Sequence, residues 1–190
     1  MQQELAEKIT EEIFSLYEKY GSADYIGEPV SQLEHMCQAA QLAEAEGYDE
    51  EVILAAFFHD IGHLCEHIMA VKQMDGYGVQ DHETLAGNYL RQNGFSEKIA
   101  RLVENHVEAK RYLTFKYSGY YHQLSEASKI TLEQQGGKMD ETEADFFERD
   151  SLHPLYIKLR QWDDKAKLEQ QPLPLLQKYK DMVLRHLFQN

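Results

Sequence analysis

Residues 52–63 read Val-Ile-Leu-Ala-Ala-Phe-Phe-His-Asp-Ile-Gly-His, an apolar run followed directly by a histidine and an aspartate. The apolar run predicts a helix that is buried in the protein, so His59 and Asp60 are expected to lie in the interior as well. Burying an ionised carboxylate beside an imidazole is costly unless a cation or a hydrogen-bond partner compensates. A metal ion is the simplest compensation, and the other histidines decide whether one is expected.

The composition is that of an ordinary globular protein. The chain has 190 residues, of which 43% are apolar and 27% charged, and one domain spanning residues 1–190 is expected. The formal net charge is −14, so duplex nucleic acid and anionic membranes would be repelled, and neither is expected as a partner. A small anionic substrate stays compatible, because a metal site and a few cationic side chains can reverse the field in a pocket.

The chain carries no recognisable signal for export or membrane insertion. Met1–Lys8 is polar, and no stretch approaches the ~18 uninterrupted apolar residues of a membrane span. Cys37 and Cys65 lack a C-x-x-C spacing and are expected to be buried thiols in a reducing compartment. The expected location is therefore the cytoplasm.

Helical periodicity runs through nearly the whole chain. A first helix is indicated by an apolar stripe of Leu5, Ile9, Ile13, Leu16 and Tyr17. Further helices are expected to begin after the capping residues Ser31, Asp49, Asp81 and Ser96, the last of them running through Glu108. No convincing strand pattern is found, so the sequence predicts an all-α single domain.

Histidines and aspartates recur on successive predicted helices. Each helix brings one or two nitrogen or oxygen ligands, as in metal sites built inside helical bundles. The candidate ligands are His35, His59, Asp60, His82, His106 and Asp163. This set exceeds what one tetrahedral metal uses, so two metals that share one bridging carboxylate fit the count better.

This arrangement resembles the HD-domain superfamily, which is named for its His-Asp metal ligands. The stretch from Tyr25 to His35, Tyr-Ile-Gly-Glu-Pro-Val-Ser-Gln-Leu-Glu-His, resembles the N-terminal segment of the mixed-valent di-iron HD oxygenases. Myo-inositol oxygenase is a more distant relative of these enzymes. The resemblance covers residues 25–163 and implies an all-α HD-domain bundle with a dinuclear metal site in its core.

The resemblance also implies which residues bind which metal. His35, His59, Asp60 and Asp163 would hold one iron of an Fe(II)/Fe(III) pair, and Asp60 would bridge to a second iron held by His82 and His106. Asp164 follows Asp163 directly, so the identity of the last ligand stays open by one residue. Iron itself is not readable from the ligand types, because His/Asp sites also accept Mn or Zn.

The implied reaction is the O2-dependent oxidative cleavage of the C–P bond of a small hydroxyphosphonate. The expected substrate is (R)-2-amino-1-hydroxyethylphosphonate, and the products would be glycine and phosphate. Hydrolysis of an unactivated C–P bond is slow, whereas removing hydrogen from the adjacent carbon opens an oxidative route. The metals would supply the redox chemistry, and Asp60 and His63 are the expected catalytic residues.

Several further side chains are expected to contact the substrate. Lys110 lies one helical turn after His106, and Arg160 one turn before Asp163, and cations in these places suit a phosphonate. The resemblance implies that Glu28 receives the substrate ammonium and that Tyr25 covers an iron until substrate displaces it. The full expected set is Tyr25, Glu28, Gln32, His63, Lys110, Ser128, Thr131 and Arg160.

Plainer interpretations of these residues stay open at the level of sequence. Lys110 and Arg160 can be solvated charges, Tyr25 and Glu28 ordinary loop residues, and His63 a structural histidine. Two other functions also fit the His-Asp core. One is a phosphohydrolase acting on a nucleotide or phosphate monoester through a metal-activated water, and the other is a non-catalytic module that senses a ligand.

Overall fold

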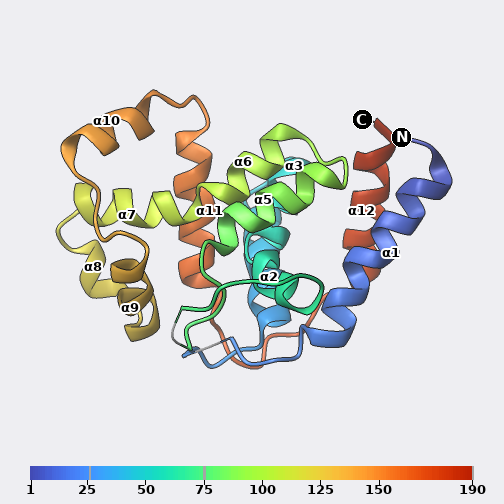
Figure 1. The fold of residues 1–190 in the computed structure, drawn as a ribbon, viewed down its shortest axis with the longest axis horizontal. Helices are drawn as coiled ribbons and strands as arrows, with labels where there is room; N and C mark the ends of the chain where they lie inside the picture. Colours follow the sequence, from blue (N-terminus) through green and yellow to red (C-terminus); the bar gives the residue numbers. More distant parts are fainter. Residues whose placement is uncertain (26, 75, 190) are drawn as a thin grey trace.

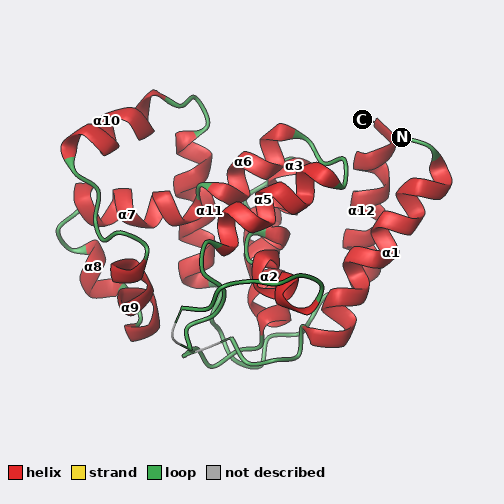
Figure 2. Cartoon of the chain, in the orientation of Figure 1, coloured by secondary structure: helices red, strands yellow, loops and turns green. Residues whose placement is uncertain are grey.

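The structure is a computed structural model that describes residues 1–25, 27–74 and 76–189. Ile26, which belongs to the stretch that carries the family resemblance, lies outside the described residues. The described part of the chain consists of helices and loops, with two isolated β-bridges, and the prediction of an all-α fold is confirmed (Figure 2). The elements are α1 (Gln3–Tyr20), α2 (Gln32–Ala45), α3 (Glu50–Phe58), α4 (Ile61–Leu64), the short 3₁₀ helix η1 (Cys65–His67), α5 (His82–Gln92), α6 (Glu97–Glu104), α7 (His106–Lys116), α8 (Tyr120–Gln123), α9 (Glu126–Gln134), α10 (Glu141–Arg149), α11 (His153–Lys165) and α12 (Leu176–Gln189). Over the same residues, no helix has the length and apolar character needed to cross a bilayer.

Most of the predicted helix starts are confirmed by their caps. Ser31 forms a capping box with Glu34, and the side chains of Asp49 and Ser96 accept hydrogen bonds from the first turns of α3 and α6. Asp81 precedes α5 as predicted, but its side chain makes no capping bond and its backbone is left-handed, with φ 55°.

The prediction of a single helix from Ser96 through Glu108 is wrong. It divides at Asn105, whose backbone leaves helical geometry at φ −98° and ψ 7°. The Asn105 side chain donates to the carbonyl of Arg101, which also accepts the Asn105 backbone N–H, so both bonds fix Asn105 at the end of α6. The consequence for the site is that His106 begins a new helix, α7, instead of lying within α6.

The hydrophobic core lies where α3 packs between α2, α6, α11 and α12. The helices α1 and α12, far apart in sequence, lie side by side at one end, and α7 to α10 form the other end (Figure 1). The Phe57 ring of α3 lies 4.8 Å from the Tyr17 ring and 4.4 Å from the Tyr179 ring, and these contacts join α1, α3 and α12. The predicted stripe of α1 is wrong at Leu5, which is 49% exposed, because Ala6 occupies the inward position instead.

A close backbone contact after α3 determines where the His-Asp pair lies. The chain leaves the helix at Asp60, with φ −106° and ψ 12°, and resumes as α4. A Cβ atom on Gly62 would lie 2.0 Å from the carbonyl oxygen of His82, so only glycine lets α4 approach the start of α5 this closely. This contact brings the end of α3 and the start of α5 together.

Candidate metal centre and substrate cavity

Main-chain carbonyls orient the buried histidines. Nδ1 of His35 lies 2.8 Å from the carbonyl of Ala166, and Nδ1 of His59 lies 2.8 Å from that of Ala56. Nδ1 of His106 likewise lies 2.7 Å from the carbonyl of Val103. A carbonyl only accepts, so each Nδ1 carries the proton and each Nε2 presents a lone pair, which is the form of histidine that binds metals.

These lone pairs face one another in two pairs. The Nε2 atoms of His35 and His59 lie 3.0 Å apart, and those of His82 and His106 lie 3.2 Å apart. Two ligands at right angles, each roughly 2.1 Å from a shared metal, lie about 3 Å apart. The spacing within each pair is therefore that of neighbouring ligands on one ion.

Asp60 lies between the two histidine pairs and presents one oxygen to each. Its Oδ2 lies 3.5 Å from Nε2 of both His35 and His59. Its Oδ1 lies 3.3 Å from Nε2 of His82 and 3.5 Å from Nε2 of His106. This is the geometry that a carboxylate needs in order to bridge two cations.

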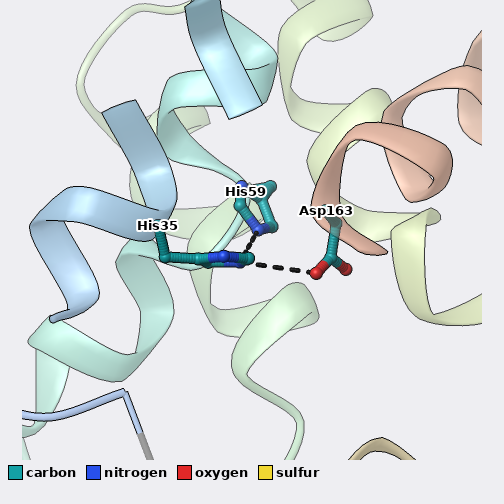
Figure 3. A group of neighbouring side chains, drawn as sticks. All are labelled: His35, His59 and Asp163. Carbon is teal, nitrogen blue, oxygen red and sulfur yellow. Dashed lines mark hydrogen bonds and ion pairs between the residues drawn. The ribbon is translucent and has the colours of Figure 1, made fainter. Parts of the chain in front are cut away.

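Asp163 rather than Asp164 joins this group. Its Oδ1 lies 3.4 Å from Nε2 of His35, and Figure 3 shows the two side chains, from α11 and α2, pointing toward each other beside His59. Asp164 points elsewhere, because its carboxylate accepts hydrogen bonds from Arg160 and from the Tyr120 hydroxyl. The geometry thus favours Asp163 as the last of the predicted ligands.

The donor set fits cations better than it fits an ion-free interior. Asp60 Oδ2 and Asp163 Oδ1 are buried and accept no hydrogen bond among the described residues. Burial opposes ionisation of both carboxyls, but the neighbouring histidines and, for Asp163, Arg160 hold their pKa values well below the usual range. Burial also lowers the pKa of His59 to about 4, so its ring is neutral and free to bind a metal. Buried carboxylates with unused oxygens beside histidines that turn Nε2 toward them have the chemistry of a metal site.

A cavity of about 220 Å³ opens beside this centre. Its lining includes Asp60, His82, His106 and Asp163, so a small molecule in the cavity would reach the metal position. Each side chain that the sequence analysis assigned to substrate also lines it, namely Tyr25, Glu28, Gln32, His63, Lys110, Ser128, Thr131 and Arg160. The structure therefore brings the two predicted groups of residues to one place.

The two predicted cations are buried, so the alternative that they are solvated charges is wrong. Lys110 is 3% exposed and Arg160 is 4% exposed. Nζ of Lys110 donates to Oγ1 of Thr131 at 3.0 Å, and burial together with Arg160 lowers the pKa of Lys110 to about 7. Arg160 is more fully engaged, since it donates to Asp163 at 2.7 Å, to Asp164, and to the Tyr120 hydroxyl at 3.1 Å.

Tyr25 and His63 each stack on a histidine of the centre. The Tyr25 ring lies 4.1 Å from the His35 ring, and the His63 ring 4.1 Å from the His82 ring, both nearly parallel. Nδ1 of His63 accepts the Val79 amide at 3.1 Å, so the proton of the neutral ring is on Nε2. Burial, followed by the charge of His82, lowers the pKa of His63 to about 3, which keeps the ring neutral.

Glu28 has a partner that the sequence analysis missed. Its Oε1 accepts hydrogen bonds from the Lys167 ammonium at 2.6 Å and from the Ser125 hydroxyl at 2.5 Å. The Tyr120 hydroxyl was missed as well, and it joins Arg160 to Asp164. No local pattern marks either contact, because the Glu28–Lys167 pair joins residues 139 positions apart in the chain.

Comparison with known proteins gives the family. Residues 32–154 match the HD domain. The [1-hydroxy-2-(trimethylamino)ethyl]phosphonate dioxygenase (glycine-betaine-forming) of Leisingera caerulea is 37% identical over 93% of this chain and 89% of its own length. The hydroxymethylphosphonate dioxygenase of Gimesia maris is also 37% identical, over 91% of this chain and 85% of its own. The chain belongs to the HD-domain phosphonate dioxygenase family.

A viral protein is also similar to this chain. An uncharacterized protein of Acanthamoeba polyphaga mimivirus is 45% identical over 92% of this chain and 80% of its own length. The two dioxygenases differ in the group that their substrates carry beyond the hydroxyl-bearing carbon, one being a trimethylamino compound and the other a hydroxymethyl compound. The substrates in the names of these two relatives share a hydroxyphosphonate group and differ in the tail group.

Proposed function

We propose that this protein cleaves the C–P bond of a small 1-hydroxyphosphonate with O2. The balanced reaction is R–CH(OH)–PO3H2 + O2 → R–COOH + H3PO4. The carbon that bears phosphorus is oxidised to a carboxylate, O2 takes up four electrons, and phosphorus leaves as phosphate. The observation that carries the proposal is that Asp60 presents its two oxygens to two histidine pairs beside a cavity with a buried lysine.

The metal centre in this proposal consists of six side chains. These are His35, His59, Asp60, His82, His106 and Asp163, with Asp60 between the two metal positions. A mixed-valent Fe(II)/Fe(III) pair held there would supply the activation of O2 and the one-electron redox chemistry. The protein's own part is to fix the ligands, exclude water and orient the substrate.

Lys110 is the cation best suited to bind the phosphonate. Its side chain is buried in the cavity wall and donates one hydrogen bond to Thr131. Its ammonium group therefore has two further protons for substrate oxygens. The hydroxyls of Ser128 and Thr131 line the same wall. The Ser128 hydroxyl can donate to a remaining phosphonate oxygen, whereas the Thr131 hydroxyl already donates to the carbonyl of Ser128 at 3.2 Å and serves to position Lys110. Arg160 adds positive charge, but its guanidinium already donates hydrogen bonds to Asp163, Asp164 and Tyr120.

His63 and Tyr25 would act on the other side of the substrate. The neutral His63 ring carries its proton on Nε2 and so can donate a hydrogen bond to a substrate oxygen at the second metal position. Tyr25 covers the His35 ring, and a substrate that reaches the first metal position would have to displace it. In this proposal Asp60 and His63 are the catalytic residues that the sequence analysis named.

Within this substrate class, the compound named by the sequence analysis is (R)-2-amino-1-hydroxyethylphosphonate, which would give glycine and phosphate. Its ammonium would need the carboxylate of Glu28. Because Glu28 lines the cavity, such a contact is sterically reasonable. The ammonium of Lys167, however, already pairs with Glu28 at 2.6 Å and would compete with the ammonium of such a substrate.

Oxygen dependence separates the proposed reaction from phosphohydrolysis. Iron-loaded protein is incubated with hydroxymethylphosphonate and with a phosphate monoester, each in air and under argon, and phosphate release is measured. The proposal expects phosphate from the hydroxyphosphonate in air alone. Phosphate released equally under argon would contradict the proposal and favour a hydrolase that uses the same His-Asp core.

A further inference from the structure

Lys167 places an ammonium group against the carboxylate that an amino substrate would need. Its Nζ lies 2.6 Å from Oε1 of Glu28 and 3.4 Å from Oγ of Ser128. The pair is well shielded, with the Lys167 side chain 15% and the Glu28 side chain 7% exposed. Ser125 adds a second hydrogen bond to the same oxygen at 2.5 Å. The negative charge of Glu28 is therefore already compensated by the protein.

The backbone on both sides of Lys167 is fixed. The carbonyl of Ala166 accepts the Nδ1 proton of His35 at 2.8 Å. The main chain of Leu168 makes two hydrogen bonds to the amide side chain of Gln38, at 2.9 Å and 3.0 Å. Lys167 thus lies between two anchored residues, and one of its anchors is a histidine of the candidate metal centre. Such an arrangement holds the lysine at Glu28.

The fixed ammonium of Lys167 affects which substrate tail group can bind beside Glu28. A substrate ammonium that approached Glu28 would meet the like charge of Lys167, and like charges set against each other in a shielded place are strongly unfavourable. An uncharged tail meets no such repulsion. The two dioxygenase relatives are equally identical to this chain, so their names do not decide between a cationic tail and none.

We propose that Lys167 is a specificity-determining residue that selects hydroxyphosphonates with an uncharged tail over those with an ammonium tail. This inference rests on the proposed C–P cleavage and narrows its substrate class. It also changes the role of Glu28, which holds Lys167 in place instead of receiving the substrate's amine. Hydroxymethylphosphonate and its short alkyl homologues are then the preferred substrates.

Two isosteric substrates test the selection directly. (R)-2-Amino-1-hydroxyethylphosphonate and (R)-1-hydroxypropylphosphonate differ by exchange of an ammonium for a methyl group, and phosphate release from each gives its kcat/KM. We expect the wild-type enzyme to prefer the methyl compound by about tenfold or more. A wild-type enzyme that prefers the ammonium compound would overturn the inference, although the proposed C–P cleavage would stand.

The variant Lys167→Met tests whether this residue is responsible. Its loss frees the Glu28 carboxylate, so we expect kcat/KM for the ammonium substrate to rise about tenfold, mainly through a lower KM. The value for the methyl substrate should change by less than about twofold. Lys165→Met removes an exposed lysine two residues away and is the matched control, with no expected change. Equal changes for both substrates would mean that Lys167 has a structural role only.

Binding of uncleavable ligands keeps the inference testable apart from catalysis. 2-Aminoethylphosphonate and propylphosphonate form the same ammonium-for-methyl pair and lack the 1-hydroxyl group of the proposed substrates. Calorimetric titration of the metal-loaded wild-type protein should give tighter binding of propylphosphonate by about tenfold. Tighter binding of the ammonium compound would reject the role of Lys167. Failure of the proposed function is a different result, in which no hydroxyphosphonate releases phosphate at all.

Discussion

The Nε2 atoms of His35 and His59 lie 3.0 Å apart, although the Nδ1 atom of each ring already faces a main-chain carbonyl. Two nitrogen lone pairs at this distance repel each other unless positive charge lies between them. The positions of the carbonyls of Ala166 and Ala56 thus preorganise both rings for a shared cation. Backbone geometry, and not the histidines alone, gives this pair the arrangement that a shared metal ion would need.

Loss of one member of this pair should remove one metal. For His35→Ala we expect the metal content of the purified protein to fall from about two ions per chain to about one, because the other pair and Asp60 stay intact. Inductively coupled plasma mass spectrometry gives the ratio. The exposed His122, changed to alanine, is the control and should leave the content unchanged. A His35→Ala protein that retains the wild-type ratio would argue against a ligand role for His35.

Asp163 and Asp164 should respond differently to the same change. Asp163→Asn weakens the group that faces His35 and should lower metal content, whereas Asp164→Asn should keep it. Asp164 orients Arg160, so its loss should raise KM for the phosphonate by about tenfold with little change in bound metal. Metal analysis together with steady-state kinetics distinguishes the two. The reverse pattern would assign the last ligand to Asp164.

Activity should fall as the pH rises through the pKa of Lys110. Burial lowers that pKa to about 7, so the ammonium form that binds a phosphonate is complete below this value and is lost above it. We expect kcat/KM to decline by about tenfold per pH unit above the pKa. Lys110→Arg keeps its charge at every pH used and should remove the decline. A decline of equal steepness in Lys110→Arg would assign it to another group.

Gly62 should be intolerant of any side chain. In Gly62→Ala the new methyl group would meet the carbonyl of His82 at 2.0 Å, and α4 would have to move away from α5. We expect a loss of about 1–3 kcal/mol in the free energy of unfolding, measured by urea denaturation. Gly119→Ala is the control, since no atom lies within 4 Å of its new methyl group and its φ is −84°. A Gly62→Ala protein as stable as wild type would show that this contact is dispensable.

The helical fold and the burial of His59 and Asp60 were predictable because their signals are local. The apolar run before His59 indicates burial, and the capping box at Ser31 marks the start of α2. The break at Asn105 was not predictable, since neither glycine nor proline marks it. The bonds of Lys167 to Glu28 and of Tyr120 to Arg160 were also missed, because they join residues that only the fold brings together.

The dinuclear centre bridged by Asp60 is tested most directly by electron paramagnetic resonance at low temperature on the iron-loaded protein, with Asp60→Ala for comparison. The account predicts a signal from an exchange-coupled Fe(II)/Fe(III) pair in the wild-type protein and its loss in the variant. A wild-type spectrum that contains only isolated Fe(III), with one iron per chain, would contradict it.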